Sequence, residues 1–213
     1  NATSYEYTGE GYLKTIAFDP TGINARVEFT YDSVGNPISQ KDPNGNTTTF
    51  SYNALNWKTQ DLDVYGFRTK YTYDGNGNVV KTEREIRDNN GTSWQTSEFT
   101  YTILNKPASI KDPLNRVTNI TYDLNDNRRT IVDALNHTTT YDFDERDLPW
   151  KTTDANNGIT QNDYDINGNL SKITDAKSNP TNYTYDNFDR LEKMTYADGT
   201  FSQFSYDKDS NIT

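Results

Sequence analysis

Polar and hydrophobic residues alternate in short runs that end at a tyrosine and recur along the whole chain. In one such run, Thr48, Phe50 and Tyr52 fall on one side of an extended strand, and Thr49 and Ser51 fall on the other. This alternation is typical of a half-buried antiparallel strand. The tyrosine marks the same place in each repeat, and its equivalents are Tyr7, Tyr31, Tyr52, Tyr73, Tyr101, Tyr122, Phe143, Tyr164, Tyr185 and Tyr206.

The spacing of these positions is regular. Seven of the nine intervals are 21 residues, and the exceptions are 24 residues (Tyr7 to Tyr31) and 28 residues (Tyr73 to Tyr101). A fixed period of this length predicts one supersecondary unit per repeat, stacked on its neighbours.

Each tyrosine run is followed by a predicted turn. An acidic residue comes first, at Asp32, Asp74, Asp123 and Asp165, and in three of these turns a glycine follows three residues later, at Gly35, Gly77 and Gly168. Aspartate accepts bonds from the backbone that follows it, and glycine adopts the positive φ that a reversal requires. Where glycine is missing, we expect left-handed backbone at Asn56, Asn105, Asp126, Asp147, Asp189 and Ser210.

A second strand and a second turn complete the repeat. The strand around Ile38 to Lys41 is followed by Asp42-Pro43-Asn44-Gly45, which suits a type I turn. Each repeat is therefore predicted to be a β-hairpin. The 28-residue repeat inserts seven residues around Arg87 to Thr92, which we interpret as a projecting hairpin with Trp94 on its return strand.

The predicted fold class is all-β, with tandem antiparallel hairpins of about 21 residues forming one long curved or spiral sheet. Two strands per repeat extend a sheet by about 10 Å, and sheets this long curl because their twist accumulates. Residues 1–213 are expected to form a single array of about nine repeats. Both ends fall inside a repeat, so we expect the array to belong to a larger protein.

Composition and charge narrow the functional classes. Hydrophobic residues make up 31% of the chain, below the usual value of about 45–50%, yet aromatic residues make up 13%, which disfavours disorder. A net charge of −10 argues against nucleic acid as a partner, and the sequence has no run of about 20 apolar residues that would insert into a membrane. The chain has no cysteine, which excludes disulfides and thiolate metal sites.

The repeated pattern resembles the RHS/YD-repeat family. Tyr71-Thr72-Tyr73-Asp74-Gly75-Asn76-Gly77 matches its Tyr-x-Tyr-Asp-x-x-Gly motif, and Asp42-Pro43-Asn44-Gly45 matches its second turn. The resemblance covers essentially the whole chain. Where the family typically has arginine after the turn glycine, this chain has Asn36, Asn78 and Asn169.

The resemblance implies a large β-shell. In bacterial insecticidal toxin complexes and Rhs toxins such repeats enclose a C-terminal toxin, and in teneurins a similar shell supports cell-surface adhesion. It therefore implies a secreted or cell-surface protein whose partners are the rest of its own longer chain, with a toxin or adhesive domain, or neighbouring copies joined by edge-strand pairing. The self-cleaving core of the family is not recognisable in this sequence.

Candidate reactive groups favour structural roles. The one histidine, His137, lies in a turn, and the aspartates occupy repeated turn positions where local hydrogen bonding explains them. The runs Asp74-x-Asn76-x-Asn78 and Asp165-x-Asn167-x-Asn169 resemble half of a calcium loop, but Val79 and Leu170 stand where such a loop needs glycine. We therefore expect no enzyme, no catalytic or metal site and no cofactor.

The tryptophans support the alternative interpretation, a cell-surface adhesin or carbohydrate-binding repeat module. Trp57, Trp94 and Trp150 could stack on sugar rings, although aromatic residues at repeated positions usually pack within the sheet. The favoured function is a structural β-repeat scaffold, a segment of a shell that encloses a toxin or other cargo or forms a cell-surface structure. A polysaccharide-degrading enzyme is a distant third interpretation.

Overall fold

The computed structural model describes residues 2–213, and these residues form nineteen β-strands and no helix. They divide into two compact units, the first ending at Asn115 and the second running from Arg116 to Thr213. The first unit contains β1 (Thr3–Tyr7), β2 (Leu13–Phe18), β3 (Ala25–Tyr31), β4 (Pro37–Lys41), β5 (Thr47–Tyr52), β6 (Lys58–Leu62), β7 (Arg68–Tyr73), β8 (Val79–Asp88), β9 (Gly91–Tyr101) and β10 (Pro107–Lys111). The second contains β11 (Val117–Tyr122), β12 (Arg128–Val132), β13 (Thr138–Phe143), β14 (Pro149–Thr153), β15 (Ile159–Tyr164), β16 (Leu170–Thr174), β17 (Pro180–Tyr185), β18 (Leu191–Thr195) and β19 (Phe201–Gln203).

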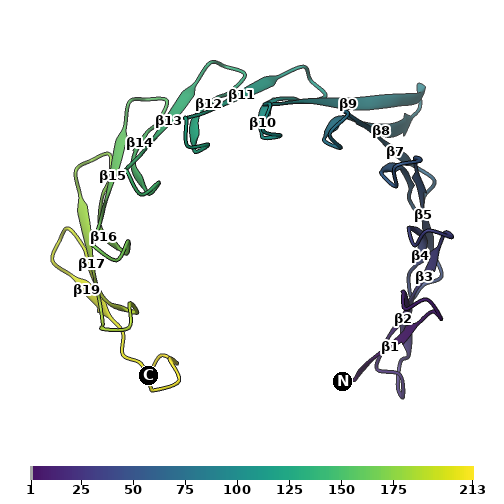
Figure 1. Cartoon of the computed structure of the whole chain (residues 1–213), viewed down its shortest axis with the longest axis horizontal. Coiled ribbons are helices and arrows are strands. Elements are labelled where there is room, and N and C mark those ends of the chain that lie inside the picture. The colour runs from purple at the N-terminus through teal and green to yellow at the C-terminus, as the bar shows by residue number, and fades with distance from the viewer. Residues whose placement is uncertain (1) are drawn as a thin grey trace. The chain divides into compact units, whose positions relative to one another are not determined.

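Within each unit every strand pairs antiparallel with the next strand in the sequence. The strands therefore follow one another in chain order, and in each unit the row of strands bends instead of lying flat (Figure 1). The all-β class and the tandem antiparallel hairpins predicted from the alternation are confirmed. The bend within each unit follows from strand twist, which accumulates along a sheet.

The turn after each repeat tyrosine has the expected backbone. Gly35, Gly77 and Gly168 have positive φ of 92°, 87° and 88°. The positions without glycine are also left-handed, as the sequence predicts, at Asn56, Asn105, Asp126, Asp147, Asp189 and Ser210. Asparagine and aspartate tolerate this conformation because their short polar side chains bond to the local backbone.

A β-bulge beyond each of these turns was not predicted. In the hairpin of β3 and β4, Tyr31 faces Pro37 and Thr30 faces Ser39, so Ile38 has no partner. The same shift occurs in the other hairpins next to the repeat tyrosine or its equivalent. Between β13 and β14 it lies next to Phe143, and Trp150 is the residue without a partner. The alternation of the first strand cannot reveal it, because the extra residue belongs to the second strand. A bulge changes the direction in which a side chain points, so these positions differ from the regular faces of the sheet.

The sheets are a single layer with very little buried core. Among residues 2–213, the side chains classed as buried are Ala17, Thr15 and Glu85. The accessible surface is 14339 Å², whereas a globular protein of this mass, 24.4 kDa, would expose about 10,000 Å². With so little apolar burial, stability depends on the strand ladders and on contacts between neighbouring repeats.

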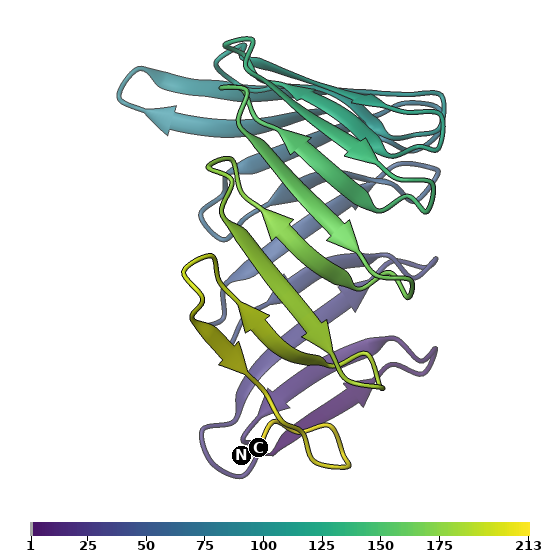
Figure 2. The ribbon, with the colours of Figure 1, turned by 90° about the vertical axis from the view of Figure 1, so that its left-hand side faces the viewer.

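The inserted residues lengthen one hairpin, as predicted. β8 and β9 have 10 and 11 residues, and their pairing continues to Asp88 and Gly91. Pairing of β8 with β7 stops at Arg84, and pairing of β9 with β10 stops at Glu98. The end of this hairpin therefore extends past its neighbours in the first unit, as the pale blue-green pair of strands in Figure 2 shows.

Candidate functional site

The repeat tyrosines join each repeat to the one before it. The hydroxyl of Tyr52 donates to the carbonyl oxygen of Pro37 at 2.9 Å, and Tyr73 donates to Lys58 at 2.7 Å. Each acceptor is the residue that faces the tyrosine of the preceding repeat across its hairpin. The equivalent bonds of Tyr31, Tyr101, Tyr164, Tyr185 and Tyr206 end on Leu13, Val79, Pro149, Leu170 and Leu191.

The tyrosine hydroxyl bonds to the equivalent carbonyl group even where the repeat is longer than 21 residues. Most of these bonds span 15 residues, but that of Tyr31 spans 18 and that of Tyr101 spans 22. The insertions lie in the second half of a repeat, so they leave the bonded positions unchanged. Phe143 has no hydroxyl and stands in the place of a tyrosine donor.

The aspartates close their own turns. Asp32 Oδ1 accepts the backbone N–H groups of Val34 and Asn36, at 3.0 and 2.9 Å, and Asp32 Oδ2 accepts the Asn36 amide at 2.9 Å. Asp74 makes the same bonds with Asn76 and Asn78. The bond from the asparagine side chain is the main cause that lowers the pKa of each aspartate below its ordinary value. These oxygens are occupied by turn bonds, which favours the capping interpretation over calcium ligation.

Alternate turns carry asparagine five residues after the repeat tyrosine, and we call these the asparagine turns. Their asparagines are Asn36, Asn78, Asn127, Asn169 and Asn211. Each of the first four donates a second amide bond to the next turn, and the acceptors are the side chains of Asn56, Asn105, Asp147 and Asp189 at 2.9, 2.8, 2.7 and 2.7 Å. The left-handed non-glycine residue is thus also the acceptor for its neighbour.

The turns between them carry a larger side chain at the same position, and we call these the bulky turns. Their residues are Tyr12, Trp57, Lys106, Leu148 and Arg190. Trp57 covers Gly77, where an added Cβ would lie 3.1 Å from the indole, and its ring centroid is 5.3 Å from that of Tyr73. Arg190 lies over the ring of Tyr206 and donates to the Ser210 hydroxyl. After Tyr12, Trp57 and Leu148 the next turn carries a glycine that makes room for the large side chain.

The two turn types therefore alternate with a period of two repeats, and each fits the other. The sequence interpretation treated all repeats as equivalent and missed this relationship. The signal was present in the strict alternation of asparagine with larger residues at one position. The absence of the family arginine at Asn36, Asn78 and Asn169 has the same explanation, because each asparagine bonds to both its own turn and the next.

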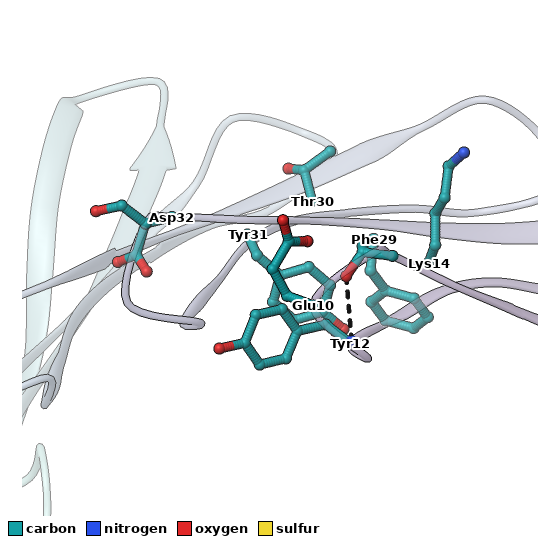
Figure 3. Close-up of a pocket in the computed structure, with 9 residues that line it drawn as sticks. Glu10, Tyr12, Lys14, Phe29, Thr30, Tyr31 and Asp32 are labelled. Atoms are coloured by element: carbon teal, nitrogen blue, oxygen red, sulfur yellow. Dashed lines mark hydrogen bonds between the residues drawn. The ribbon is translucent and has the colours of Figure 1, made fainter.

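A hollow of about 640 Å³ lies at the first bulky turn. The rings of Tyr12 and Tyr31 stack with centroids 5.0 Å apart, and Figure 3 shows these rings and Phe29 on one side of the strands, with Thr30 pointing to the other. Tyr31 and Phe29 thus share the face that the alternation assigned to them. Glu10 and Lys14 also line the hollow, which is open and polar at its rim.

The three tryptophans have different surroundings. Trp57 packs within the row of turns as described above. Trp94 lies beneath the cations of Lys70 and Arg68, which are 4.3 and 5.5 Å from its ring centroid. Trp150 is 37% exposed and lies in a hollow of about 420 Å³ with Ile159. Of the three, Trp150 offers the most open aromatic face.

A buried carboxylate fixes the base of the projecting hairpin. Glu85 is 1% exposed and bonds to Arg68 Nε at 2.7 Å and to Arg87 Nε at 2.8 Å. Arg87 also donates to the carbonyl of Gly66 in the preceding turn and lies over the ring of Phe67. The bonds from Arg68 and then Arg87 lower the pKa of Glu85 to about 2.

The other reactive groups are engaged in turns. His137 Nδ1 lies 3.0 Å from Asp133 Oδ2 within one turn, and both side chains are well exposed. Within residues 2–213, no group of three or more histidine, cysteine or acidic side chains is arranged to hold a metal ion. Nor does any of these residues belong to a helix that could span a lipid bilayer.

Two stretches of the chain match the RHS Repeat family model, residues 31–67 and 164–200. The chain carries RHS repeats. Both stretches begin at the tyrosine of an asparagine turn, Tyr31 or Tyr164, and continue through the bulky turn that follows. Among curated protein sequences, none is significantly similar to this chain.

Several solved structures have a similar fold, among them TcdB2-TccC3 structures and a Tc holotoxin pore. Over 99% of its length the chain is similar to the crystal structure of TcdB2-TccC3-TEV, with a TM-score of 0.67 and 15% identity, and it covers 14% of that chain. It is similar to TcdB2-TccC3-Cdc42 with a TM-score of 0.56, 10% identity and the same 99% coverage, and covers 15% of that chain. A Photorhabdus luminescens Tc holotoxin pore gives a TM-score of 0.53 and 11% identity, again over 99% of the present chain and 15% of the other.

The chain thus spans about one seventh of the structures it resembles. Its architecture is that of tandem β-hairpin repeats, and residues 31–67 and 164–200 of it match RHS repeats.

Proposed function

We propose that the chain is a segment of shell wall in a longer secreted or cell-surface polypeptide, where it encloses a toxin or other cargo and has no catalysis of its own. The observation that carries this proposal is the continuous bonding between neighbouring repeats within each unit. Repeat tyrosines bond to the preceding repeat, and asparagine turns bond to the next turn.

Such bonding suits a barrier. Neighbouring strands lie about 4.8 Å apart, so a continuous ladder leaves no opening through which another polypeptide can pass. The single-layer sheets have few buried side chains, so their rigidity must come from bonds repeated at every step. The polar cluster of Glu85, Arg68 and Arg87 is not repeated, and its ion pairs at the base of the projecting hairpin suit a structural role.

The comparisons support this proposal at the level of fold. The structures similar to this chain are those of Tc toxin assemblies, and the chain covers 14–15% of them. A segment that covers about one seventh of such a structure suits one part of a wall. The rest of the polypeptide would then carry the cargo and other functions.

The test is limited proteolysis of the complete polypeptide that contains this chain. We expect any enclosed segment to resist protease while the array is folded. In a Gly77→Val variant the new side chain meets Trp57, so the wall should loosen and the cargo should become cleavable. The matched control is Gly45→Val, which has a similar φ of 86° but open space around an added Cβ.

Two results would contradict the wall proposal. One is cleavage of all segments outside the array at the same rate in the native polypeptide and in the Gly77→Val variant. The other is unchanged protease resistance of the remaining segments after the array has been deleted from the polypeptide.

The second candidate function is glycan binding at Trp150. Trp150 is the extra residue of the β-bulge in β14, and its hollow also contains Gln161, Asn157 and Asp175. An exposed aromatic face surrounded by amide and carboxylate groups suits stacking on a sugar ring with hydrogen bonds to its hydroxyls.

A glycan array compares Trp150→Ala with the wild-type chain. We expect the signal to be lost in this variant and retained in Trp94→Ala, because two cations lie over the ring of Trp94, the nearer 4.3 Å from its centroid, whereas one, Lys151, lies 5.8 Å from that of Trp150. The absence of any glycan signal from the folded wild-type chain, or an equal signal from Trp150→Ala, would overturn this second candidate.

A further inference from the structure

The projecting hairpin presents a strand edge that has no partner in the first unit. β10 pairs with β9 only from Glu98 onward, so within residues 2–115 the segment Gly91–Ser97 lacks a strand neighbour on that side. We call this segment the β9 edge. Unpaired edges attract further strands, and proteins usually protect them with charged residues, proline or a covering loop.

The other side of the hairpin is protected in that way. Past Arg84, β8 carries Glu85, Arg87 and Asp88, and Arg87 donates to the carbonyl of Gly66 in the turn before β7. The backbone N–H of Arg68 also donates to Glu85. Charge and a neighbouring turn thus cover the β8 side of the hairpin.

The β9 edge has none of these protections. Its residues Thr92, Ser93, Trp94, Gln95, Thr96 and Ser97 are uncharged and include no proline. Threonine and tryptophan are also favourable in strands. The ion pairs of Glu85 hold the base of the hairpin, so the edge is presented by a fixed element, and a partner strand would not have to order it.

The direction of the free peptide groups follows from the register. Asp88 faces Gly91 across a two-residue turn, and bonded and non-bonded pairs then alternate along the hairpin. The peptide groups of Thr92, Trp94 and Thr96 therefore point away from β8. An incoming antiparallel strand can bond to all three of these residues.

We propose that the β9 edge pairs antiparallel with the β9 edge of a second copy of this chain, forming a dimer that is closed by two-fold symmetry. Centred on Trp94, this pairing sets Thr92 opposite Thr96 of the other copy and Ser93 opposite Gln95, and each outward peptide group meets another. No like charges face each other. The two tryptophans become directly opposed neighbours, an arrangement favourable for aromatic residues on paired strands.

Self-complementarity favours a second copy over other occupants. Each chain carries a net charge of −10, so two copies repel each other at long range. An uncharged edge allows contact in spite of this repulsion. Added salt should strengthen the dimer by screening the repulsion, whereas a dimer held by ion pairs would weaken.

The experiment measures the association of the whole chain by analytical ultracentrifugation over a range of protein concentrations, at low and high salt. The Ser93→Lys/Gln95→Lys variant places lysine opposite lysine twice in the proposed dimer, and we expect it to weaken dimerisation by about tenfold. The matched variant Ser93→Lys/Gln95→Glu places lysine opposite glutamate and should restore dimerisation. Both positions are exposed in the single chain, so folding should be preserved.

The mode of association distinguishes this edge from the ends of the array. Pairing of two identical edges stops at a dimer, whereas pairing between β1 and β19 of successive copies would continue into open chains. A wild-type chain that remains monomeric at all concentrations would overturn the proposal. Equal behaviour of the two lysine-containing variants, or open chains insensitive to both, would also overturn it.

Discussion

The hydroxyl of Tyr185 donates to the carbonyl oxygen of Leu170 at 2.9 Å, and Leu170 is the residue that faces Tyr164 across the preceding hairpin. One side chain therefore connects two successive repeats at the point where a β-bulge interrupts their ladder. A tyrosine phenol is a neutral donor at physiological pH, and burial raises the pKa of Tyr185 above its ordinary value. This bond explains why the repeat uses tyrosine at a position where phenylalanine would supply the same ring.

Removing one such hydroxyl should weaken the array measurably. Tyr52→Phe removes the bond to Pro37 and leaves that half-buried carbonyl without its donor. We expect the free energy of unfolding in urea to fall by about 1 kcal/mol. The reverse change, Phe143→Tyr, should raise it by a similar amount by supplying a donor to the preceding repeat. Equal stabilities of both variants and the wild-type chain would show that the hydroxyls do not join the repeats.

The contact between Trp57 and Gly77 predicts different effects for two glycine substitutions. Gly77→Ala and Gly45→Ala both place alanine at positive φ, which costs about 1 kcal/mol. Only Gly77→Ala also meets the indole, and overpacking adds about 1–3 kcal/mol. Urea unfolding should therefore show a larger loss for Gly77→Ala. A Trp57→Ala/Gly77→Ala double variant should lose this extra cost, and its persistence would contradict the assigned contact.

Alternation of the two turn types predicts that repeats are best removed in pairs. Deleting residues 144–164 removes one repeat and leaves Asn127 next to Gly168, which has no side-chain acceptor. Deleting residues 144–185 removes two repeats and restores an aspartate, Asp189, as the acceptor. The shorter deletion should therefore give the less cooperative thermal unfolding transition. A more cooperative transition for the shorter deletion would show that the repeats are interchangeable.

Glu85 predicts a loss of stability in acid. Its pKa is about 2 in the folded chain against an ordinary 4.5, so between these values the unfolded chain binds more protons. The stabilisation is complete above about pH 4.5 and is lost as the pH falls towards 2. Urea unfolding as a function of pH should show this loss, and Glu85→Gln should reduce its slope. The same slope in the variant would mean that Glu85 does not contribute.

Tyr71 predicts a loss of stability in alkali. Burial, together with its bond to Asp61, raises its pKa to about 12 from an ordinary 10. Stabilisation is complete below pH 10 and is lost as the pH rises through 12, because the unfolded chain releases this proton more readily. Tyr71→Phe should be less sensitive to pH in this range when unfolding is followed by circular dichroism. Unchanged sensitivity would assign the effect to other tyrosines.

The alternation and the turn residues were sufficient to predict the hairpins, their turns and the projecting hairpin around Arg87 to Thr92. They succeeded because both signals are local, a period of two along a strand and a left-handed residue in a turn. The left-handed backbone at Asn56 and Asp189 was predicted for the same reason. Local patterns of this kind carry no information about which atoms of neighbouring repeats meet.

Contacts between repeats were therefore the part that the pattern did not reveal. The bond from Asn36 to Asn56 and the contact of Trp57 with Gly77 depend on the register across several strands and on the bulge at each hairpin. The ion pairs of Glu85 with Arg68 and Arg87 join residues up to 17 positions apart. For the tryptophans, the sequence named three equal candidates, and only the structure distinguishes Trp150 by its bulge and exposure.

Native-state hydrogen exchange, resolved by repeat, tests most directly the claim that neighbouring repeats are joined into a continuous wall. We expect amides of an interior strand such as β14 to be protected far better than those of β19, and Tyr164→Phe to reduce protection in both repeats that its hydroxyl joins. If β14 exchanges as fast as β19, or if the substitution affects only its own hairpin, the repeats are independent and the account is wrong.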